Sequence, residues 1–218
     1  MLPQILFENN AFTVSVKPAG IISEFGGFPD ILSEYYKDRG ENSDIFPVHR
    51  LDRDVSGVMV YARTQKYAAA LSSLIAERKL NKEYLAVIKG TPEENSGEYR
   101  DFLFKDSKKN KSYVVKRVRR GVKEAILKYL LIETCNECSL VKVALVTGRS
   151  HQIRVQFASR KTPLLGDTRY GGPSGCQIAL FSHCISFTCP FSGKEYSFSC
   201  TPPENYPWSL FNNVTQEK

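Results

Sequence analysis

Residues 49–57 read His-Arg-Leu-Asp-Arg-Asp-Val-Ser-Gly and lead directly into a short apolar run at residues 57–61. Such a run has the length of one strand. The polar part places three cations or potential cations and two carboxylates within six positions. A nearby arginine keeps a carboxylate ionised, which suits a nucleophile or a general base. A polar loop with local salt bridges is the alternative, and residues 49–57 taken alone favour it.

Apolar patterns on both sides of this stretch predict mainly strands. Alternating or continuous apolar residues predict strands at 12–16, 57–61, 82–89, 125–133, 140–146, 180–187 and 196–198. Helical spacing predicts short helices at 30–37, after the capping residue Thr64, and after Gly148. Strands with few intervening helices indicate an α+β fold with a central, mostly antiparallel mixed sheet and flanking helices.

Composition places the chain among ordinary globular proteins. Of its 218 residues, 42% are apolar and 24% charged, which excludes fibrous and wholly disordered classes. No apolar run approaches the roughly 18 residues that a membrane helix needs, and we see no secretory signal at the start. Six cysteines are too few for a disulfide scaffold, so we expect reduced thiols and a cytoplasmic protein.

Positive charge is concentrated in residues 105–128, here called the basic segment. It holds ten Lys or Arg and two acids, whereas the remaining 20 basic and 21 acidic residues nearly cancel. A localised positive charge favours a polyanionic partner, because neutralising phosphates releases counterions. A solvated, partly mobile loop explains the same composition, and charge alone does not decide between them.

Two further polar clusters stand out. Residues 147–154 read Thr-Gly-Arg-Ser-His-Gln-Ile-Arg, in which Gly148 permits a tight turn before a helix. Residues 81–90 read Asn-Lys-Glu-Tyr-Leu-Ala-Val-Ile-Lys-Gly, a strand in which Tyr84 alone would be an ordinary core aromatic. Residues 147–154 can equally be a helix cap with solvated arginines.

In this order, the three clusters resemble the signature of the RluA family of pseudouridine synthases. That signature is His-Arg-Leu-Asp-x-x-Thr-Ser-Gly, then Lys-x-Tyr-x-Ala-x-Val-x-Gly, then Thr-Gly-Arg-x-His-Gln-Ile-Arg. The family-like segments at 5–9, 16–20, 163–167 and 170–171 extend the likeness over most of the chain. Two departures are Val55 in place of Thr, and Arg160-Lys161 where the family often has Gly-His.

The resemblance implies an RNA-modifying isomerase that needs no cofactor or metal. It implies a catalytic domain with an active-site cleft, which we expect to span residues 1–218. As a third departure from the family pattern, we expect no accessory N-terminal RNA-binding domain. We also expect a frayed tail at about 212–218. Asp52 would be the catalytic carboxylate, Arg154 its basic partner, and Tyr84 a contact to the base. Arg50 would enter the RNA stack in place of the flipped nucleotide. Further RNA contacts are expected at His49, Arg149, His151, Lys116, Arg117, Arg119 and Arg120.

The expected partner is tRNA or rRNA, with no membrane association and a monomeric protein. A non-catalytic RNA-binding protein and a metal-dependent phosphoesterase are the alternatives, the latter using His49, Asp52, Asp54 and His151. The joint presence of Asp52, Tyr84 and Arg154 argues against the first, and the lack of a clear acidic ligand set argues against the second. Cys135 and Cys138 form a Cys-x-x-Cys without a second pair at zinc spacing, and His183 lies in an apolar strand pattern typical of a core histidine.

Overall fold

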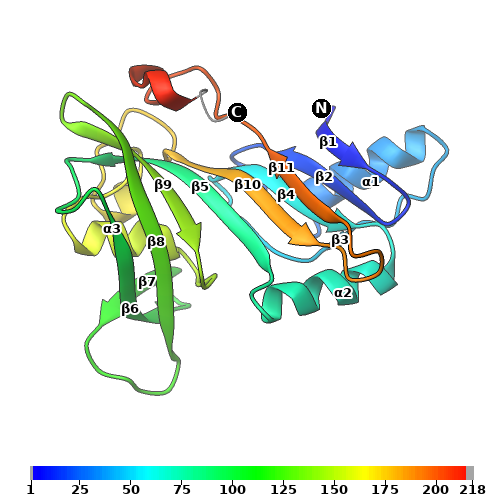
Figure 1. Cartoon of the computed structure of the whole chain (residues 1–218), viewed down its shortest axis with the longest axis horizontal. Helices are drawn as coiled ribbons and strands as arrows, with labels where there is room; N and C mark the ends of the chain where they lie inside the picture. The colour runs from blue at the N-terminus through cyan, green and yellow to red at the C-terminus, as the bar shows by residue number, and fades with distance from the viewer. Residues whose placement is uncertain (1, 215–218) are drawn as a thin grey trace. The chain divides into compact units, whose positions relative to one another are not determined.

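The computed structural model describes residues 2–214 and contains two compact units (Figure 1). Unit 1 comprises the residues up to Lys82 together with Phe181–Cys200, and unit 2 comprises Glu83–Leu180 together with the described residues from Thr201 onward. Strands dominate both units, most described strand pairs are antiparallel, and β4 and β10 pair in parallel. The predicted α+β class with a mostly antiparallel mixed sheet is therefore confirmed.

Unit 1 has the strand order β1–β2–β4–β10–β11, and the short β3 also pairs with β4. These strands span Gln4–Glu8 (β1), Phe12–Lys17 (β2), Phe46–Pro47 (β3), Ser56–Ala62 (β4), Leu180–Thr188 (β10) and Glu195–Ser199 (β11). Every residue of β4 after Ser56 is buried. Burial on both faces explains why this strand is continuously apolar rather than alternating.

Unit 1 contains two helices, α1 (Phe28–Asp38) and α2 (Gln65–Ala76). The Thr64 side chain accepts a hydrogen bond from the Tyr67 N–H at 3.2 Å, as the predicted N-cap of α2 requires. Leu71 and Leu74 pack into the same apolar core as Phe12 of β2. This apolar stripe holds α2 against the sheet, since packing rather than propensity stabilises short helices.

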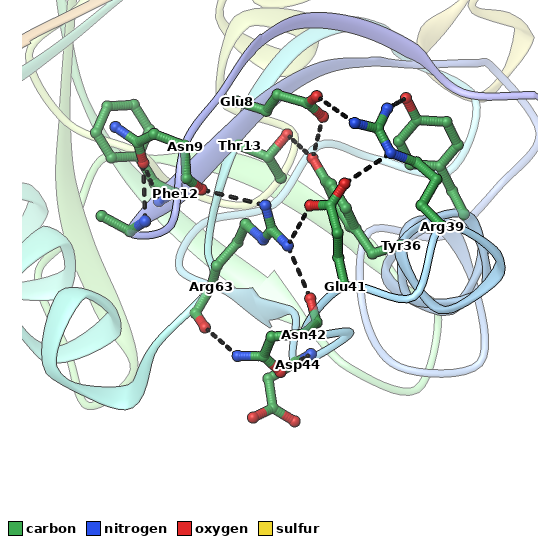
Figure 2. Close-up of polar contacts among 12 residues, drawn as sticks. Glu8, Asn9, Phe12, Thr13, Tyr36, Arg39, Glu41, Asn42, Asp44 and Arg63 are labelled. Carbon is green, nitrogen blue, oxygen red and sulfur yellow. Dashed lines mark hydrogen bonds and ion pairs between the residues drawn. The ribbon is translucent and has the colours of Figure 1, made fainter.

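A buried arginine joins α1 to the β1–β2 hairpin and to the end of β4 (Figure 2). The Arg63 guanidinium donates to the carbonyl oxygens of Asn9 and Asn42 at 3.2 and 2.8 Å. It also donates to the Glu41 carboxylate at 3.1 Å and lies 3.8 Å from the centroid of the Tyr36 ring. A charge is tolerated inside a protein when it is paired and hydrogen-bonded, so this network fixes α1 in unit 1.

Unit 2 has the strand order β5–β9–β8–β6–β7, and its described pairs are antiparallel. These strands span Leu80–Lys89 (β5), Ser96–Asp106 (β6), Lys111–Val115 (β7), Val122–Cys135 (β8) and Cys138–Leu145 (β9). The helix expected after Gly148 is α3 (Gln152–Ser159). Its Phe157 packs against Tyr99 of β6 and Tyr129 of β8, with ring centroids 5.2 and 5.9 Å apart.

Two strands of unit 2, β6 and β7, were not predicted. Tyr99 and Leu103 of β6 are buried, whereas the residues between and around them are mostly exposed or half-buried. Charged residues on the exposed face hide the alternation, so the sequence pattern predicts no strand here. In the structure this segment contains the end of β6, all of the short β7 and the start of β8, and β6 pairs with both of the other strands (Figure 1).

The C-terminal part of the described chain returns to unit 2. The backbone N–H groups of Asn212 and Asn213 donate to the Glu133 carboxylate at 3.4 and 3.1 Å, and Val214 is buried. The rest of the predicted frayed tail, residues 215–218, lies outside the described residues. Within residues 2–214, no helix has the length and apolar character needed to cross a membrane.

Candidate active site

Asp52 lies in a closed turn within residues 49–57, here called the Asp52 loop, whose last two residues begin β4 in unit 1. The Val55 N–H donates to the Asp52 carbonyl oxygen at 3.1 Å. The flanking Leu51 and Val55 side chains are buried, whereas Asp52 is half-buried. Two buried apolar anchors and a backbone hydrogen bond thus give Asp52 a defined position. At the position where the family signature has threonine, Val55 closes the turn through its backbone N–H.

Gly57 ends the Asp52 loop at a point where only glycine fits. Its φ is +125°, and a Cβ atom there would lie 2.4 Å from the Ser182 carbonyl oxygen of β10. Gly57 and Ser182 are partners in the parallel pairing of β4 and β10. Glycine at this position of the first motif therefore allows β4 and β10 to approach each other closely.

Residues 18–27, here called the β2–α1 loop, are joined to the Asp52 loop by two reciprocal pairs of hydrogen bonds. The Ser23 hydroxyl donates to the Leu51 carbonyl at 2.9 Å and accepts from the Leu51 N–H at 3.0 Å. The Gly20 N–H donates to the Arg53 carbonyl at 2.9 Å, and the Arg53 guanidinium donates back to the Gly20 carbonyl at 2.9 Å. Leu51 and Arg53, the neighbours of Asp52 in the chain, are thus held in place by residues of the β2–α1 loop.

A buried lysine, Lys17 at the end of β2, also joins these loops. Its ammonium donates to the Pro18 and Ile21 carbonyl oxygens at 2.8 and 2.7 Å. It also donates to the Arg53 carbonyl oxygen at 3.2 Å. All three donors of a lysine ammonium can be satisfied in this way. The sequence pattern places Lys17 in a family-like segment but gives it no role. A lysine at the end of a strand that is buried on both faces is the signal that could have revealed its role in joining the two loops.

The charge of Lys17 acts on the same loop. Burial lowers the pKa of Lys17 from 10.5 to about 8, while attraction to Asp54 and Asp52 acts in the opposite direction. Because about 8 lies above neutral pH, the ammonium remains mostly charged there. Lys17 therefore supplies a buried positive charge near the Asp52 carboxylate.

His49 is engaged inside unit 1. Its Nε2 accepts a hydrogen bond from the Val60 N–H of β4 at 3.1 Å, and its Nδ1 is buried with no hydrogen-bond partner among the described residues. Burial, and secondarily the charge of Lys82, lowers the pKa of His49 from 6.5 to about 3. The imidazole is therefore neutral at physiological pH.

This environment of His49 makes the protein sensitive to acid. Below pH 6.5 the unfolded chain binds a proton at this histidine, whereas the folded chain binds it only near pH 3. Stability is therefore lost as the pH falls from 6.5 towards 3. Between pH 7 and 4.5 we expect the free energy of unfolding to fall by about 2–3 kcal/mol more in the wild type than in His49→Gln, which keeps an acceptor but cannot titrate. Urea unfolding followed by circular dichroism measures both, and equal losses would contradict the assignment.

Thr147 and Gln152 of the third motif hold the turn that leads into α3. The Thr147 hydroxyl accepts from the Ile126 N–H of β8 and donates to the Gln152 side-chain oxygen, both at 2.8 Å. The same oxygen accepts from the Arg149 N–H at 2.9 Å. His151 then takes a left-handed conformation, with φ +54°, as the N-cap residue. Several residues of this motif thus have a structural task, which is to set the position of Arg154.

Arg154 lies in α3 and forms a buried ion pair with Asp167. Its Nε and Nη2 atoms lie 2.6 and 2.9 Å from the two carboxylate oxygens, and both side chains are at most 5% exposed. This two-bond geometry fixes the plane of the guanidinium. The sequence placed Asp167 in a family-like segment without a role, because the pairing depends on a tertiary contact.

The predicted RNA contacts Arg149 and His151 are both engaged within unit 2. The Arg149 Nε donates to the Glu124 carbonyl at 2.8 Å. The His151 Nδ1 lies 2.9 Å from the Tyr170 hydroxyl, and this hydroxyl accepts a hydrogen bond from the Ser112 N–H at 2.8 Å. These contacts join β7 and β8 to the start of α3.

The remaining predicted residues occupy different environments. Tyr84 of β5 is buried and pairs with Val143 of β9. Arg50 is largely exposed and forms an ion pair with Glu24 of the β2–α1 loop. Tyr84 and Arg154 belong to unit 2 and Asp52 to unit 1, so the pairing of Asp52 with Arg154 stays a prediction.

Residues 116–121, which connect β7 and β8, form the middle of the basic segment. Residues 116–121 are all exposed, and the Arg119 guanidinium lies 5.0 Å from the centroid of the Phe104 ring. This connection includes four of the predicted RNA contacts, namely Lys116, Arg117, Arg119 and Arg120.

No metal-binding cluster is evident in residues 2–214, where no group of three or more His, Cys, Asp or Glu side chains could hold an ion. Cys135 and Cys138 face each other across the two-residue turn between β8 and β9, with Asn136 at φ +53°. The Cys-x-x-Cys spacing is thus that of a hairpin. His183 is buried, with Nδ1 2.8 Å from the Cys200 carbonyl, which confirms it as a core histidine with a hydrogen-bond partner.

Comparison with known proteins places these residues in a family. Residues 11–159 match the family model described as RNA pseudouridylate synthase. The chain is 34% identical over 179 residues to an uncharacterized RNA pseudouridine synthase of Bacillus subtilis, covering 78% of the chain and 58% of that protein. It is 33% identical over 223 residues to the ribosomal large subunit pseudouridine synthase D of Xanthomonas campestris, covering 92% of the chain and 66% of that protein.

The fold resembles that of a solved structure. The structure of human RNA pseudouridylate synthase domain containing 4 matches with a TM-score of 0.82 at 22% identity, covering 95% of this chain and 91% of that one. The chain spans about three fifths to two thirds of the length of the two bacterial relatives, at 58% and 66%. On the family model, the identities and the three motifs, the chain belongs to the RluA family of RNA pseudouridine synthases.

Proposed function

We propose that this protein isomerises uridine to pseudouridine in RNA, with Asp52 as the catalytic carboxylate. The observation that carries the proposal is the half-buried Asp52 turn, held by the β2–α1 loop and by the charged Lys17 inside the region that matches the family. Binding alone requires no carboxylate, because a carboxylate repels phosphate. A fixed carboxylate beside a buried cation is an arrangement suited to chemistry.

The reaction balances without a cofactor. The N1–C1′ bond of uridine breaks, a C5–C1′ bond forms, C5 loses its proton to solvent, and N1, which carries no hydrogen in uridine, gains one. Cleavage of the first bond leaves an electron-poor sugar carbon, which an ionised carboxylate can attack or stabilise. Attack at C1′, addition to the ring and removal of a ribose proton all use Asp52 as the ionised group. Tyr84 is proposed to contact the detached base.

Arg154 is proposed to orient Asp52. Asp167 engages the Nε and Nη2 atoms, which form one edge of the guanidinium. The opposite edge carries further N–H donors of the kind that a second carboxylate accepts. A guanidinium held by one buried carboxylate is in this way preorganised to hold another.

Arg50 is proposed to enter the RNA when the target nucleotide flips out. Its ion pair with Glu24 joins two side chains that are 66% and 57% exposed. Pairs of this kind stabilise a conformation by about 0–1 kcal/mol. RNA phosphates and bases can therefore replace Glu24 as the partner of Arg50.

The exposed basic connection is proposed to bind the RNA backbone. Changing Lys116, Arg117, Arg119 and Arg120 to Ala should weaken RNA binding and lower the salt dependence of log Kd by about 0.7 for each phosphate that the variant no longer neutralises. Filter binding of unmodified RNA over a series of KCl concentrations measures this slope. The matched control removes the same charge from exposed lysines of unit 1, namely Lys37, Lys66, Lys79 and Lys194. A slope that changes equally in both variants would show that only net charge matters.

The RNA is proposed to be tRNA or rRNA, modified in the cytoplasm by a monomer. Mapping pseudouridine across the RNA of cells with and without this protein tests the activity and identifies the target together. Loss of one or more specific pseudouridines in the deletion strain, restored by the wild-type chain but not by Asp52→Asn, is the expected result. Identical maps would contradict the proposal.

A further inference from the structure

An exposed phenylalanine lies at the tip of a tight part of the β2–α1 loop. The Phe28 N–H donates to the Ile22 carbonyl at 3.0 Å and closes the chain around the residues between them. A Cβ atom on Gly27 would lie 2.4 Å from the Ile22 side chain, so these residues are already in close contact. The Gly26 N–H donates to the Asp30 carboxylate at 3.0 Å. Within this ordered turn Phe25 is 66% exposed.

The residues just before Phe25 contact the Asp52 loop. Ser23 exchanges two hydrogen bonds with Leu51, which is adjacent to Asp52 in the chain. Glu24 forms its ion pair with Arg50. Phe25 therefore extends into solvent from a segment that is attached to the candidate active site by its two preceding residues.

The surroundings of Phe25 suit a nucleic acid base. Ile22, which is 41% exposed, adds apolar surface in the same turn. On the adjoining loop the exposed Arg53 supplies positive charge, and Arg50 supplies a second charge once RNA replaces Glu24 as its partner. Flat apolar rings next to cations are the combination by which proteins bind unpaired nucleotides, because bases stack on the ring while the cations neutralise phosphates.

We infer that Phe25 is a substrate-binding residue that stacks on a nucleobase next to the target uridine. The inference rests on the proposed function, which places a flipped uridine at Asp52 and so leaves its neighbours without a stacking partner. A base beside the gap gains an aromatic surface from the protein. Isolated exposed apolar residues are common, but this one combines an ordered turn, attachment to the Asp52 loop and adjacent arginines.

Kinetics provide the first test, with total RNA from cells lacking the protein as the probe. Phe25→Ala should raise KM for this RNA about tenfold with kcat within about twofold, since loss of one stacked base weakens binding by roughly that factor. Phe25→Trp should restore KM, because it replaces one flat ring by another. The control is Phe191→Ala, which removes an exposed phenylalanine, 47% exposed, at the turn between β10 and β11 of the same unit. A KM of Phe25→Ala equal to that of the wild type would overturn the inference. The exposed ring would then be explained by a contact with another protein.

Fluorescence provides a direct test of stacking. The chain has a single tryptophan, Trp208, which is buried. The Phe25→Trp variant therefore adds one exposed fluorophore, and stacking on a base should quench it when the same RNA is added. Phe191→Trp should show no quenching beyond that of the wild type. Equal responses of the two variants would overturn the inference.

The variant Asp52→Asn separates this inference from the proposed function. Weaker RNA binding by Phe25→Ala in the Asp52→Asn background supports stacking even without turnover. Full activity of Asp52→Asn would refute the proposed function, whereas unchanged binding by Phe25→Ala with an inactive Asp52→Asn would refute the stacking role alone.

Discussion

Replacing Asp52 by Asn is expected to reduce turnover by about three orders of magnitude or more while RNA binding stays within about threefold of the wild type. Asparagine keeps the shape of the side chain but removes the charge that the reaction needs. The turn itself should persist, because it is closed by the backbone bond from Val55 to the Asp52 carbonyl and by the buried Leu51 and Val55.

The matched control for this variant is Asp54→Asn. Asp54 lies in the same loop, is exposed, and like Asp52 is attracted by Lys17. Tritium release from RNA labelled at C5 of uridine measures turnover, and filter binding measures affinity. Asp54→Asn should keep activity near the wild-type level. Activity of Asp52→Asn within tenfold of the wild type, or an equal loss in Asp54→Asn, would contradict the role of Asp52.

Loss of the Arg154 guanidinium should produce the second large effect. In Arg154→Ala the Asp167 carboxylate, 1% exposed, is left without its ion-pair partner. Removing one member of a buried pair typically costs about 3–5 kcal/mol. We therefore expect Arg154→Ala to be strongly destabilised in urea unfolding and inactive.

The conservative variant Arg154→Lys separates positioning from folding. Lysine keeps the charge for Asp167 but cannot form the two parallel hydrogen bonds of the fork. It should fold and bind RNA, yet lose about a hundredfold in kcat with KM little changed, as expected when a catalytic group is misoriented. Asp167→Asn should also lower kcat, because it removes the carboxylate that holds the Arg154 guanidinium by two hydrogen bonds. If Arg154→Lys retained full kcat, Arg154 would serve stability alone.

Much of the fold followed from local patterns, and the missed elements have a physical reason. The continuous apolar run at residues 57–61 and the capping Thr64 identify β4 and α2, because strand burial and helix capping are encoded locally. β6 was missed since charged side chains alternate with its buried Tyr99 and Leu103. Its stability comes from pairing with β7 and β8, which the local sequence does not reveal.

The candidate site was predicted in part. The motifs identified Asp52, Tyr84 and Arg154, but not the groups that hold them. Lys17 and Asp167 lie 35 and 13 positions from Asp52 and Arg154, respectively, and their roles depend on contacts made only in the folded chain. The RNA contact of His49 stays a prediction, and the hydrogen bond that its Nε2 accepts from the Val60 N–H could not be read from the sequence.

The most direct measurement is the incubation of the purified chain with total RNA, labelled with tritium at C5 of uridine, from cells that lack the protein. We predict tritium release that matches, mole for mole, the pseudouridine found by mass spectrometry of the digested RNA, with neither product formed by Asp52→Asn. The same incubation with protein in molar excess over the RNA could instead release no tritium and form no new pseudouridine. That result would contradict the assignment of this chain as a uridine isomerase.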